Sequence, residues 1–201
     1  MNWWIQRQKK DVYVRKRDQA GYRSRAAFKL TEILDKQKWK IPSGAVVDLG
    51  SAPGSWTQVL VERFPNRAVV ACDLLEMTPI PGCLFFQGDF TDQEICKTIL
   101  NAMHGQKAAL ICSDMAPNFC GNRTIGSARM EYLADAVLNF AIETIQPKGV
   151  VVMKIFQGES FASIMKSWKD HFQIVKTYKP DASRTESSEI YLLASSKRMQ
   201  E

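Results

Sequence analysis

The stretch Asp48-Leu49-Gly50-Ser51-Ala52-Pro53-Gly54-Ser55-Trp56 decides the fold of this 201-residue chain. The short apolar run Ala45–Leu49 leads into it, and the segment Ser55–Arg63 that follows has a helix-like pattern. Glycines between a strand and a helix permit a tight turn and a close approach of the backbone to a ligand. The order strand, glycine-rich turn and helix is typical of the ligand-binding edge of an open α/β sheet.

The rest of the chain alternates between strand and helix patterns. The predicted strands are 45–49, 67–72, 83–87, 108–112, 149–156, 173–178 and 189–194. The predicted helices are 22–37, 55–63, 92–103, 128–145 and 160–171, with Ser24 placed to cap the first. A polar loop joins the last two strands, so we expect the final strand to be antiparallel. The sequence therefore predicts a Rossmann-like, doubly wound α/β domain with a seven-stranded, mostly parallel sheet.

Length and composition limit how the chain can be organised. With 45% apolar and 24% charged residues it resembles an ordinary globular protein. We expect one domain over residues 1–201, with a basic, helical N-terminal arm at 1–40 and a Rossmann-like core at 41–201. No apolar run is long enough to cross a bilayer, so we expect no membrane contact. We also expect a monomer.

The cysteines and the N-terminus indicate the compartment. The five cysteines show no C-x-x-C spacing, so we expect neither a disulfide framework nor a metal site, in a reducing compartment such as the cytoplasm. The first ten residues lack the apolar core of a secretory signal. Arg7, Lys9 and Lys10 occur there without acids, which leaves a mitochondrial leader as the minor alternative.

The net charge of +6 is concentrated at the N-terminus. Residues 1–40 hold twelve Lys/Arg against four Asp/Glu, whereas the other 161 residues hold fifteen against seventeen. A basic arm of this kind is expected to bind a polyanion such as RNA, although a solvated basic helix has the same composition. The residues expected to contact phosphates are Lys9, Lys10, Arg15, Lys16, Arg17, Arg23 and Arg25.

Two acids follow the next two predicted strands. Asp73 closes the second strand, where an acid accepts hydrogen bonds from ribose hydroxyls in related dinucleotide-binding folds. Asp89 follows the third strand and is placed to accept a hydrogen bond from an adenine amino group. Both acids are also suited to capping turns. The glycine loop does not match the G-x-G-x-x-G of nicotinamide-binding proteins, because Pro53 removes the freedom that turn needs.

The pattern D-x-G-x-x-P-G-x-W instead resembles the first motif of S-adenosylmethionine-dependent methyltransferases. In that class the loop holds the amino-acid part of the cofactor. The resemblance implies S-adenosyl-L-methionine as the cofactor and the class I methyltransferase fold. The residues expected to contact the cofactor are Gly50, Pro53, Gly54, Trp56, Asp73, Asp89 and Asp114, and a purely structural role in the core is the alternative for Trp56.

The end of the fourth strand indicates which atom is methylated. It reads Ser113-Asp114-Met115-Ala116-Pro117-Asn118 and lacks the tyrosine of the Asn/Asp-Pro-Pro-Tyr tetrapeptide of many amine methyltransferases. Carbon methylation usually needs a nucleophilic cysteine in a loop, and neither Cys112 nor Cys120 has a recognisable context of that kind. The sequence therefore favours a hydroxyl as the acceptor.

Lys29, Asp114, Lys154 and Glu189 stand in distinctive local contexts. Three of these four charged residues lie in or beside strongly apolar runs. A charge in such a place is costly unless it has a partner or a task. Two lysines and two carboxylates so far apart in sequence meet only if the fold brings them together.

The chain resembles the RrmJ/FtsJ (RlmE) family of ribosomal RNA ribose 2′-O-methyltransferases from about Trp4 to Ala194. The segments that carry the resemblance are 22–30, 48–56, 71–75, 87–90, 113–118, 154–158 and 179–184. The resemblance implies that Lys29, Asp114, Lys154 and Glu189 form the Lys-Asp-Lys-Glu catalytic tetrad of the family. The chain departs from the family at Ser55, where many members have glycine, and its loop 119–125 is less familiar.

The chemistry of a ribose hydroxyl fits this tetrad. Such a hydroxyl is a poor nucleophile until its proton leaves, so positioning and a general base carry most of the catalysis. An ordinary lysine is protonated at neutral pH and is no base. Burial in an apolar strand and a second cation favour the neutral amine, so we expect Lys154 to be the base and Lys29 the neighbouring cation. Asp114 opposes this effect and orients the ammonium or the hydroxyl, and Glu189 holds Lys29 or the ribose.

Three hypotheses follow from the sequence. The first is 2′-O-methylation of a uridine in 23S-type large-subunit ribosomal RNA, within the large ribosomal subunit. The second is the same reaction on transfer RNA or an mRNA cap, against which the compact length counts. The third is a non-catalytic RNA-binding or ribosome assembly factor. This last hypothesis predicts that residues of the cofactor loop or of the tetrad have been replaced, and both are intact.

Overall fold

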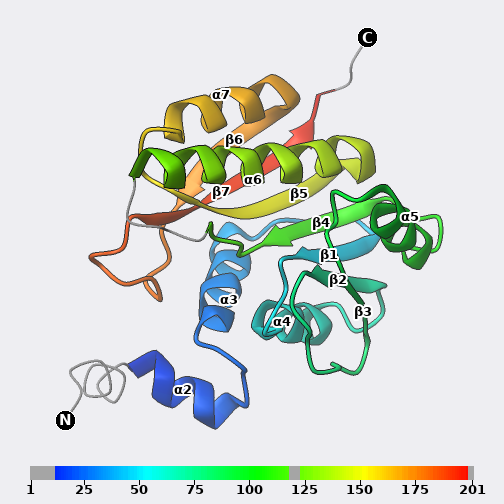
Figure 1. The fold of residues 1–201 in the computed structure, drawn as a ribbon. Coiled ribbons are helices and arrows are strands. Elements are labelled where there is room, and N and C mark those ends of the chain that lie inside the picture. Colours follow the sequence, from blue (N-terminus) through cyan, green and yellow to red (C-terminus); the bar gives the residue numbers. More distant parts are fainter. Residues whose placement is uncertain (1–11, 118–122, 199–201) are drawn as a thin grey trace.

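A seven-stranded sheet lies at the centre of the computed structural model, which describes residues 12–117 and 123–198 (Figure 1). Its strands are β1 (Ala45–Leu49), β2 (Val69–Asp73), β3 (Cys83–Gln87), β4 (Ala108–Ser113), β5 (Ile145–Phe156), β6 (Phe172–Tyr178) and β7 (Glu189–Lys197). They lie in the order β3-β2-β1-β4-β5-β7-β6. Strand β7 is antiparallel to both of its neighbours, and the other neighbouring pairs are parallel. The predicted mostly parallel sheet with an antiparallel final strand is therefore confirmed.

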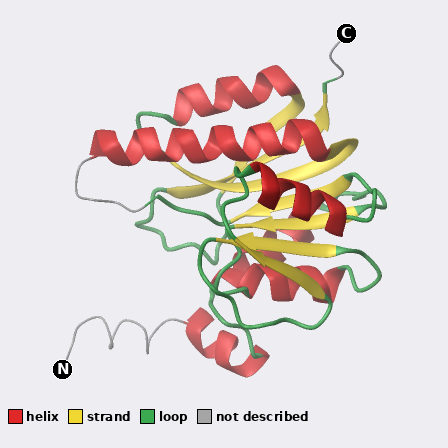
Figure 2. Cartoon of the chain, turned by 45° about the vertical axis from the view of Figure 1, so that its right-hand side comes forward, coloured by secondary structure: helices red, strands yellow, loops and turns green. Residues whose placement is uncertain are grey.

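Helices cover both faces of this sheet (Figure 2). They are α2 (Val12–Ala20), α3 (Ala26–Gln37), α4 (Ser55–Arg63), α5 (Gln93–Ala102), α6 (Arg123–Thr144) and α7 (Phe161–His171). Helices α3 and α4 pack against one face, which includes Val46 and Leu110, and α5, α6 and α7 pack against the other, which includes Val47 and Ile111. Successive residues of one strand thus enter opposite cores, which is the arrangement of a doubly wound α/β domain.

The N-terminal helical region differs from the prediction. Helix α3 begins at Ala26, later than the predicted start at residue 22, and a separate helix, α2, precedes it. Gly21, with φ 72°, follows the end of α2. Helix α2 buries no residue, so it lacks the apolar stripe that predicts a helix from sequence. Ser24 Oγ accepts a hydrogen bond from the backbone N–H of Ala26 at 3.2 Å, so its hydroxyl supports the first turn of α3 from the position before Arg25.

The boundary between α6 and β5 also differs. The predicted helix includes Ile145, but in the structure β5 begins at Ile145, which pairs with Ala108 of β4. Gln146 precedes Pro147, and the ring of a proline favours an extended conformation for the residue before it. At the other end of the sheet, β7 continues past the predicted end because Lys197 pairs with Phe172 of β6.

The order of the strands creates a crevice at one edge. The chain leaves β1 for β2 and β3 on one side and returns to β4 on the other side. Connections diverge at such a switch point and leave room for a ligand at the carboxyl ends of the strands. Gly50 follows β1, Asp73 ends β2 and Asp114 follows β4, so the fold brings these three residues to the same edge.

Asp48 is a fully buried acid in β1. Its Oδ2 accepts a hydrogen bond from the Thr57 hydroxyl at 2.6 Å, whereas no partner of its Oδ1 is found among the described residues. Burial raises the pKa of Asp48 to about 7, with smaller contributions from the negative charges of Asp114 and Asp73, and the Thr57 hydrogen bond opposes the rise.

We expect the stability of the fold to depend on pH through Asp48. Its pKa of about 7 in the fold lies above the ordinary 3.8, so the unfolded chain loses this proton first. The protonated acid therefore stabilises the fold fully below about pH 4, and this stabilisation is lost as the pH rises from there through about 7. As the pH is raised from about 5 to about 8, the free energy of unfolding in urea should fall by about 2–3 kcal/mol more for the wild type than for Asp48→Asn. A constant difference between the two proteins would contradict this assignment.

Candidate active site

A cavity of about 500 Å³ opens at the carboxyl ends of β1 to β4. Four of the residues predicted to contact the cofactor line it, namely Gly50, Asp73, Asp89 and Asp114. The rest of its wall is largely apolar and includes Leu74, Leu75, Phe90, Met115, Tyr132 and Leu133. An apolar cavity with a few acids suits an adenosine, whose base packs on the apolar wall and whose polar groups reach the acids.

Two glycines shape the loop at the edge of this cavity. Gly50 has φ 73°, and a Cβ there would lie 1.9 Å from Cγ of Met115, so a side chain at this position would collide with the neighbouring loop. Gly54 has φ 104° at the start of α4, a backbone conformation that favours glycine. The loop therefore passes close to Met115 and turns into α4 only with these two glycines.

Arg23 holds the same loop from outside. Its guanidinium donates hydrogen bonds to the carbonyl oxygens of Pro53 at 2.8 Å, Thr78 at 2.7 Å and Pro79 at 3.1 Å. These contacts tie the glycine loop to the segment after β2. Pro53 and Gly54 lie outside the lining of the cavity, so their contact with a cofactor stays a prediction, as does a contact of Arg23 with RNA.

The acids Asp73 and Asp89 both cap turns and line the cavity. Asp73 accepts backbone hydrogen bonds from Ala52 and Leu75, each at 2.8 Å. Asp89 Oδ1 accepts hydrogen bonds from the backbone N–H of Thr91 at 2.9 Å and from its hydroxyl at 2.7 Å. A carboxylate has about four acceptor sites. These internal bonds therefore fix the orientation of each acid and leave it able to accept from a ligand.

Lys154 and Asp114 form an ion pair where β5 and β4 end. Lys154 is 8% exposed, and its Nζ lies 3.1 Å from Oδ1 of Asp114. The same Nζ donates a hydrogen bond to the backbone carbonyl oxygen of Asp114. Since Asp114 also lines the cavity, Lys154 lies next to the cavity at its strand-end wall.

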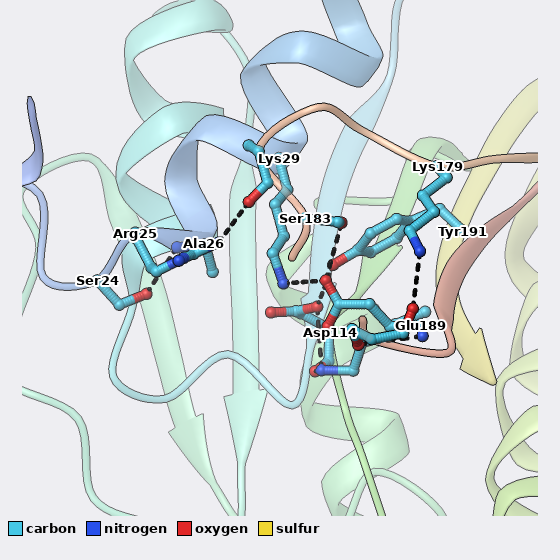
Figure 3. Close-up of polar contacts among 12 residues, drawn as sticks. Ser24, Arg25, Ala26, Lys29, Asp114, Lys179, Ser183, Glu189 and Tyr191 are labelled. Carbon is cyan, nitrogen blue, oxygen red and sulfur yellow. Dashed lines mark hydrogen bonds and ion pairs between the residues drawn. The ribbon is translucent and has the colours of Figure 1, made fainter. Parts of the chain in front are cut away.

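Lys29 and Glu189 form a second ion pair beside the first (Figure 3). Ser183 Oγ also donates a hydrogen bond to Oε1 of Glu189, at 2.8 Å. Burial acts to raise the pKa of Glu189, but the hydrogen bond and charge of Lys29, the Ser183 hydroxyl and the charge of Lys154 outweigh it and lower that pKa. Glu189 is therefore ionised at neutral pH between two lysines.

The sheet register explains why these side chains meet. In the antiparallel pair β5 and β7, Lys154 lies opposite Tyr191, and Phe156 lies opposite Glu189. Residues two apart in a strand share a face, so Glu189, Tyr191 and Lys154 project from the same face of the sheet. This is the face that α3 covers, and α3 contributes Lys29. The structure thus brings the four predicted tetrad residues together.

Tyr191 is a residue of the site that the motifs did not reveal. It is fully buried, and its hydroxyl donates a hydrogen bond to Oδ1 of Asp114 at 2.9 Å (Figure 3). Burial, followed by the charges of Asp114 and Glu189, raises its pKa well above the ordinary value, so it stays a donor. Its position in Glu189-Ile190-Tyr191, two residues after Glu189 on the same face, is the signal that would have identified it.

Trp56 supports Tyr191 from the core. Its ring centroid lies 5.6 Å from that of Tyr191, and its indole N–H donates to the carbonyl oxygen of Ala26 at 2.8 Å. At 2% exposure it lies outside the lining of the cavity, so its contact with a cofactor stays a prediction. The neighbouring Ser55, the departure from the family, shares a 2.8 Å hydrogen bond with Ser24 and joins the starts of α3 and α4.

A second cavity, of about 390 Å³, lies on the other side of the Lys29–Glu189 pair. Its lining combines Ser24, Arg25, Ala26, Lys29, Arg184, Glu186, Ser187 and Glu189. Arg184 is exposed, and Arg25 donates a hydrogen bond to the carbonyl oxygen of Ala182. We call this hollow the basic pocket, since three of its lining residues are cations.

The other predicted RNA contacts lie on or before α2. Arg15 and Lys16 are exposed, and Lys16 Nζ lies 5.4 Å from the ring centroid of Tyr13. Arg17 pairs with Asp18 on the surface. Lys9 and Lys10 lie outside the described residues. None of these observations tests RNA binding, so the contacts stay predictions.

The described cysteines do not favour a nucleophilic role. Burial raises the pKa of Cys72 and of Cys83 to about 12, and it raises the pKa of Cys112 well above the ordinary value. Burial also raises the pKa of Cys96. Thiols in such surroundings stay protonated and are poor nucleophiles. Cys120 lies outside the described residues.

Two structural findings concern metals and membranes. Across residues 12–117 and 123–198, no group of His, Cys, Asp and Glu side chains is arranged to hold a metal ion. In the same part of the chain, none of the helices combines the length and the apolar character that a membrane crossing requires.

Comparisons with known proteins agree with this geometry. Residues 22–197 match the FtsJ-like methyltransferase family. A protein of Methylobacillus flagellatus named ribosomal RNA large subunit methyltransferase E is 44% identical over 196 residues, which cover 97% of this chain and 95% of that protein. A Bordetella pertussis protein of the same name is 43% identical over 197 residues, with 95% and 94% covered.

The fold has a close counterpart among solved structures. A protein of Plasmodium falciparum, named as a ribosomal RNA methyltransferase, superimposes with a TM-score of 0.77 at 29% sequence identity. The match covers 88% of this chain and 98% of that protein. Together with the extent of the family match, the strand-end cavity and the paired lysines and acids, this shows that the chain belongs to the FtsJ-like methyltransferase family.

Proposed function

We propose that this protein transfers the methyl group of S-adenosylmethionine to the 2′-hydroxyl of a uridine in large-subunit ribosomal RNA. Membership of the methyltransferase family supports the reaction type, and the names of the relatives support ribosomal RNA of the large subunit as the substrate. The observation that carries the proposal is the place of Asp114. It lines the strand-end cavity and also holds Lys154, so it joins a cofactor site to a candidate base.

The residues of the strand-end cavity fit S-adenosylmethionine. Asp73 and Asp89 line the cavity and are oriented by their own backbone contacts, which supports them as the proposed acceptors for ribose hydroxyls and an adenine amino group. Gly50 keeps the loop close enough for contact with an amino-acid moiety. The cofactor supplies a methyl carbon on a positively charged sulfur, which reacts with a lone pair of oxygen. Asp114 and Met115 lie on the wall nearest Lys154.

Lys154 is the proposed general base. A neutral lysine amine has two N–H bonds and one lone pair. Asp114 offers two acceptors to this nitrogen, its carboxylate Oδ1 and its backbone carbonyl oxygen. When both N–H bonds are used in this way, the lone pair is left to take the proton of the ribose hydroxyl. The Tyr191 hydroxyl donates to the same Oδ1 of Asp114 and so restrains the carboxylate that orients the amine.

The basic pocket is the proposed entrance for the RNA. In RNA, the 2′-hydroxyl and the 3′-phosphate are on adjacent carbons of the ribose, so a reacting hydroxyl brings a phosphate close to the base. The pocket adjoins the Lys29–Glu189 pair and presents the cations Arg25 and Arg184. Helix α2 approaches this pocket through Tyr13, whose ring centroid lies 5.8 Å from the guanidinium carbon of Arg25 and 5.4 Å from Nζ of the exposed Lys16.

Calorimetry should detect binding of S-adenosylmethionine with a dissociation constant of about 1 µM–1 mM, the usual range for enzyme substrates. Asp89→Ala should weaken this binding by about 1–3 kcal/mol, because a buried amino group would lose its acceptor. Asp170→Ala, which removes an exposed acid of α7, is the control and should bind as the wild type does. Tight binding of NAD without binding of S-adenosylmethionine would overturn the assignment of the cavity.

Lys154→Ala should reduce methyl transfer about 10²–10⁴-fold while cofactor affinity and folding persist, because the base is lost. Lys154→Arg should not restore activity, since a guanidinium does not give up its proton at a workable pH. Asp114→Ala should also be severe, and Glu189→Ala should be milder because Glu189 supports the proton transfer and does not perform it. Single-turnover assays measure these rates. A fully active Lys154→Arg enzyme would exclude Lys154 as the base.

Affinity for RNA should fall steeply as salt concentration rises, because cations of the arm release counterions from phosphates. The double variant Arg15→Ala/Lys16→Ala should bind RNA more weakly with a smaller salt dependence and should keep its affinity for S-adenosylmethionine. The matched control is Lys166→Ala/Lys169→Ala on α7, which also removes two exposed cations. Filter binding at several salt concentrations measures both. Equal RNA affinity of the two double variants would exclude α2 as a contact surface.

A further inference from the structure

The loop between β6 and β7 places the hydroxyl of Ser183 against Glu189 in the candidate active site. Ser183, which is 8% exposed, donates its hydroxyl hydrogen bond to Oε1 of Glu189 at 2.8 Å. Lys29 pairs with the same oxygen from α3. The position of Glu189 therefore depends on two groups, one on a helix and one on a loop. A loop keeps a side chain in place only if something holds its backbone.

Glu32 of α3 holds this loop. Its Oε1 accepts hydrogen bonds from the Tyr178 hydroxyl at 2.6 Å and from the backbone N–H of Asp181 at 2.9 Å. Its Oε2 accepts from the backbone N–H of Ala182 at 3.2 Å. Two successive amides immediately before Ser183 are thus bound by one carboxylate that is about 150 residues away in sequence.

Lys29 and Glu32 act from the same face of α3. Residues three apart in a helix are neighbours on its surface. One helix face therefore contacts both parts of the arrangement, Glu189 through Lys29 and the turn that carries Ser183 through Glu32. Arg25, at the start of the same helix, adds a hydrogen bond to the carbonyl oxygen of Ala182. The helix and the turn are consequently joined by three hydrogen bonds.

The carboxylate of Glu32 binds the backbone of this turn. In the described part of the chain its partners are a tyrosine hydroxyl and two backbone amides, and no cation forms an ion pair with it. A carboxylate accepts at both oxygens, whereas the amide of glutamine accepts at one and donates at the other. Charge-assisted hydrogen bonds to backbone N–H groups are also stronger than neutral ones. The contacts therefore favour a carboxylate over an amide at this position.

We propose that Glu32 is a positioning residue for methyl transfer, because it fixes the turn that keeps Ser183 on Glu189 and thereby keeps Glu189 on Lys29. This role rests on the proposed function and goes beyond the four residues of the tetrad. Glu32 itself touches neither substrate nor cofactor in this account. Its effect reaches the reaction through Ser183 and Glu189.

The test uses Glu32→Gln, which keeps the size of the side chain and removes one acceptor. We expect kcat for RNA methylation to fall about tenfold, since small misplacements of catalytic groups are costly, while the affinity for S-adenosylmethionine changes less than about twofold. Asp35→Asn is the matched control. It also replaces a carboxylate by an amide, three residues further along α3. Asp35 forms a surface ion pair with Arg63, so this change should leave kcat unchanged.

A double-variant comparison separates positioning from a general loss of stability. In an enzyme that already carries Glu189→Ala, adding Glu32→Gln should change kcat less than about twofold, because its effect passes through the missing carboxylate. Ser183→Ala, which removes only the hydroxyl, should lower kcat as Glu32→Gln does and should not add to it. Ser183→Ala also provides the test if Glu32→Gln does not fold.

The proposal would be overturned if Glu32→Gln and Ser183→Ala both kept the wild-type kcat. It would also be overturned if Glu32→Gln lowered kcat by the same factor in the presence and in the absence of Glu189. In both cases the wild-type enzyme methylates RNA and the proposed function stands. Absence of methyl transfer by the wild type on ribosomal RNA would instead overturn the function, and the positioning role with it.

Discussion

The contact between Lys154 and Asp114 is the constraint on which the rest of the site depends. A lysine at 8% exposure in an apolar strand is costly unless its nitrogen is satisfied, and Asp114 satisfies it with a carboxylate and a carbonyl oxygen. The contact also has a geometric consequence. It ties the end of β5 to the end of β4, so the candidate base lies against the wall of the strand-end cavity.

Around this contact the fold uses its two kinds of strand pairing for different purposes. The parallel strands β1 to β4 end at a switch point and form the cavity. The antiparallel pair β5 and β7 places Lys154 and Tyr191 opposite each other, with Glu189 on the same face. Helix α3 covers that face and adds Lys29. A charged cluster is thus built where β4 and β5 end, β7 begins and α3 covers the sheet, and each member has a partner from another element.

Local patterns predicted the sheet and the glycine loop, because apolar periodicity and turn residues are properties of neighbouring residues. The assignment of the four tetrad residues came from the resemblance to a family, and the structure brings their side chains together. A basic helical arm was predicted, but the bounds of α2 were not, since this helix buries no side chain and has no apolar stripe. Glu32 and Tyr191 were missed because their roles arise from contacts with Ala182 and Asp114, 150 and 77 residues away. The loop pattern also included Trp56 among the cofactor contacts. This ring packs against Tyr191 in the core, and its contact with a cofactor stays a prediction.

The central claim is that the methyl group goes to a ribose oxygen and not to a base. Alkali cleaves RNA through attack by the free 2′-oxygen on the adjacent phosphate, so a 2′-O-methylated linkage resists it. The most direct measurement incubates the protein with large-subunit ribosomal RNA and S-adenosylmethionine labelled in its methyl group, followed by complete alkaline hydrolysis. The account predicts that the label appears in alkali-resistant dinucleotides. Label in mononucleotides alone would show methylation of a base and would contradict the account.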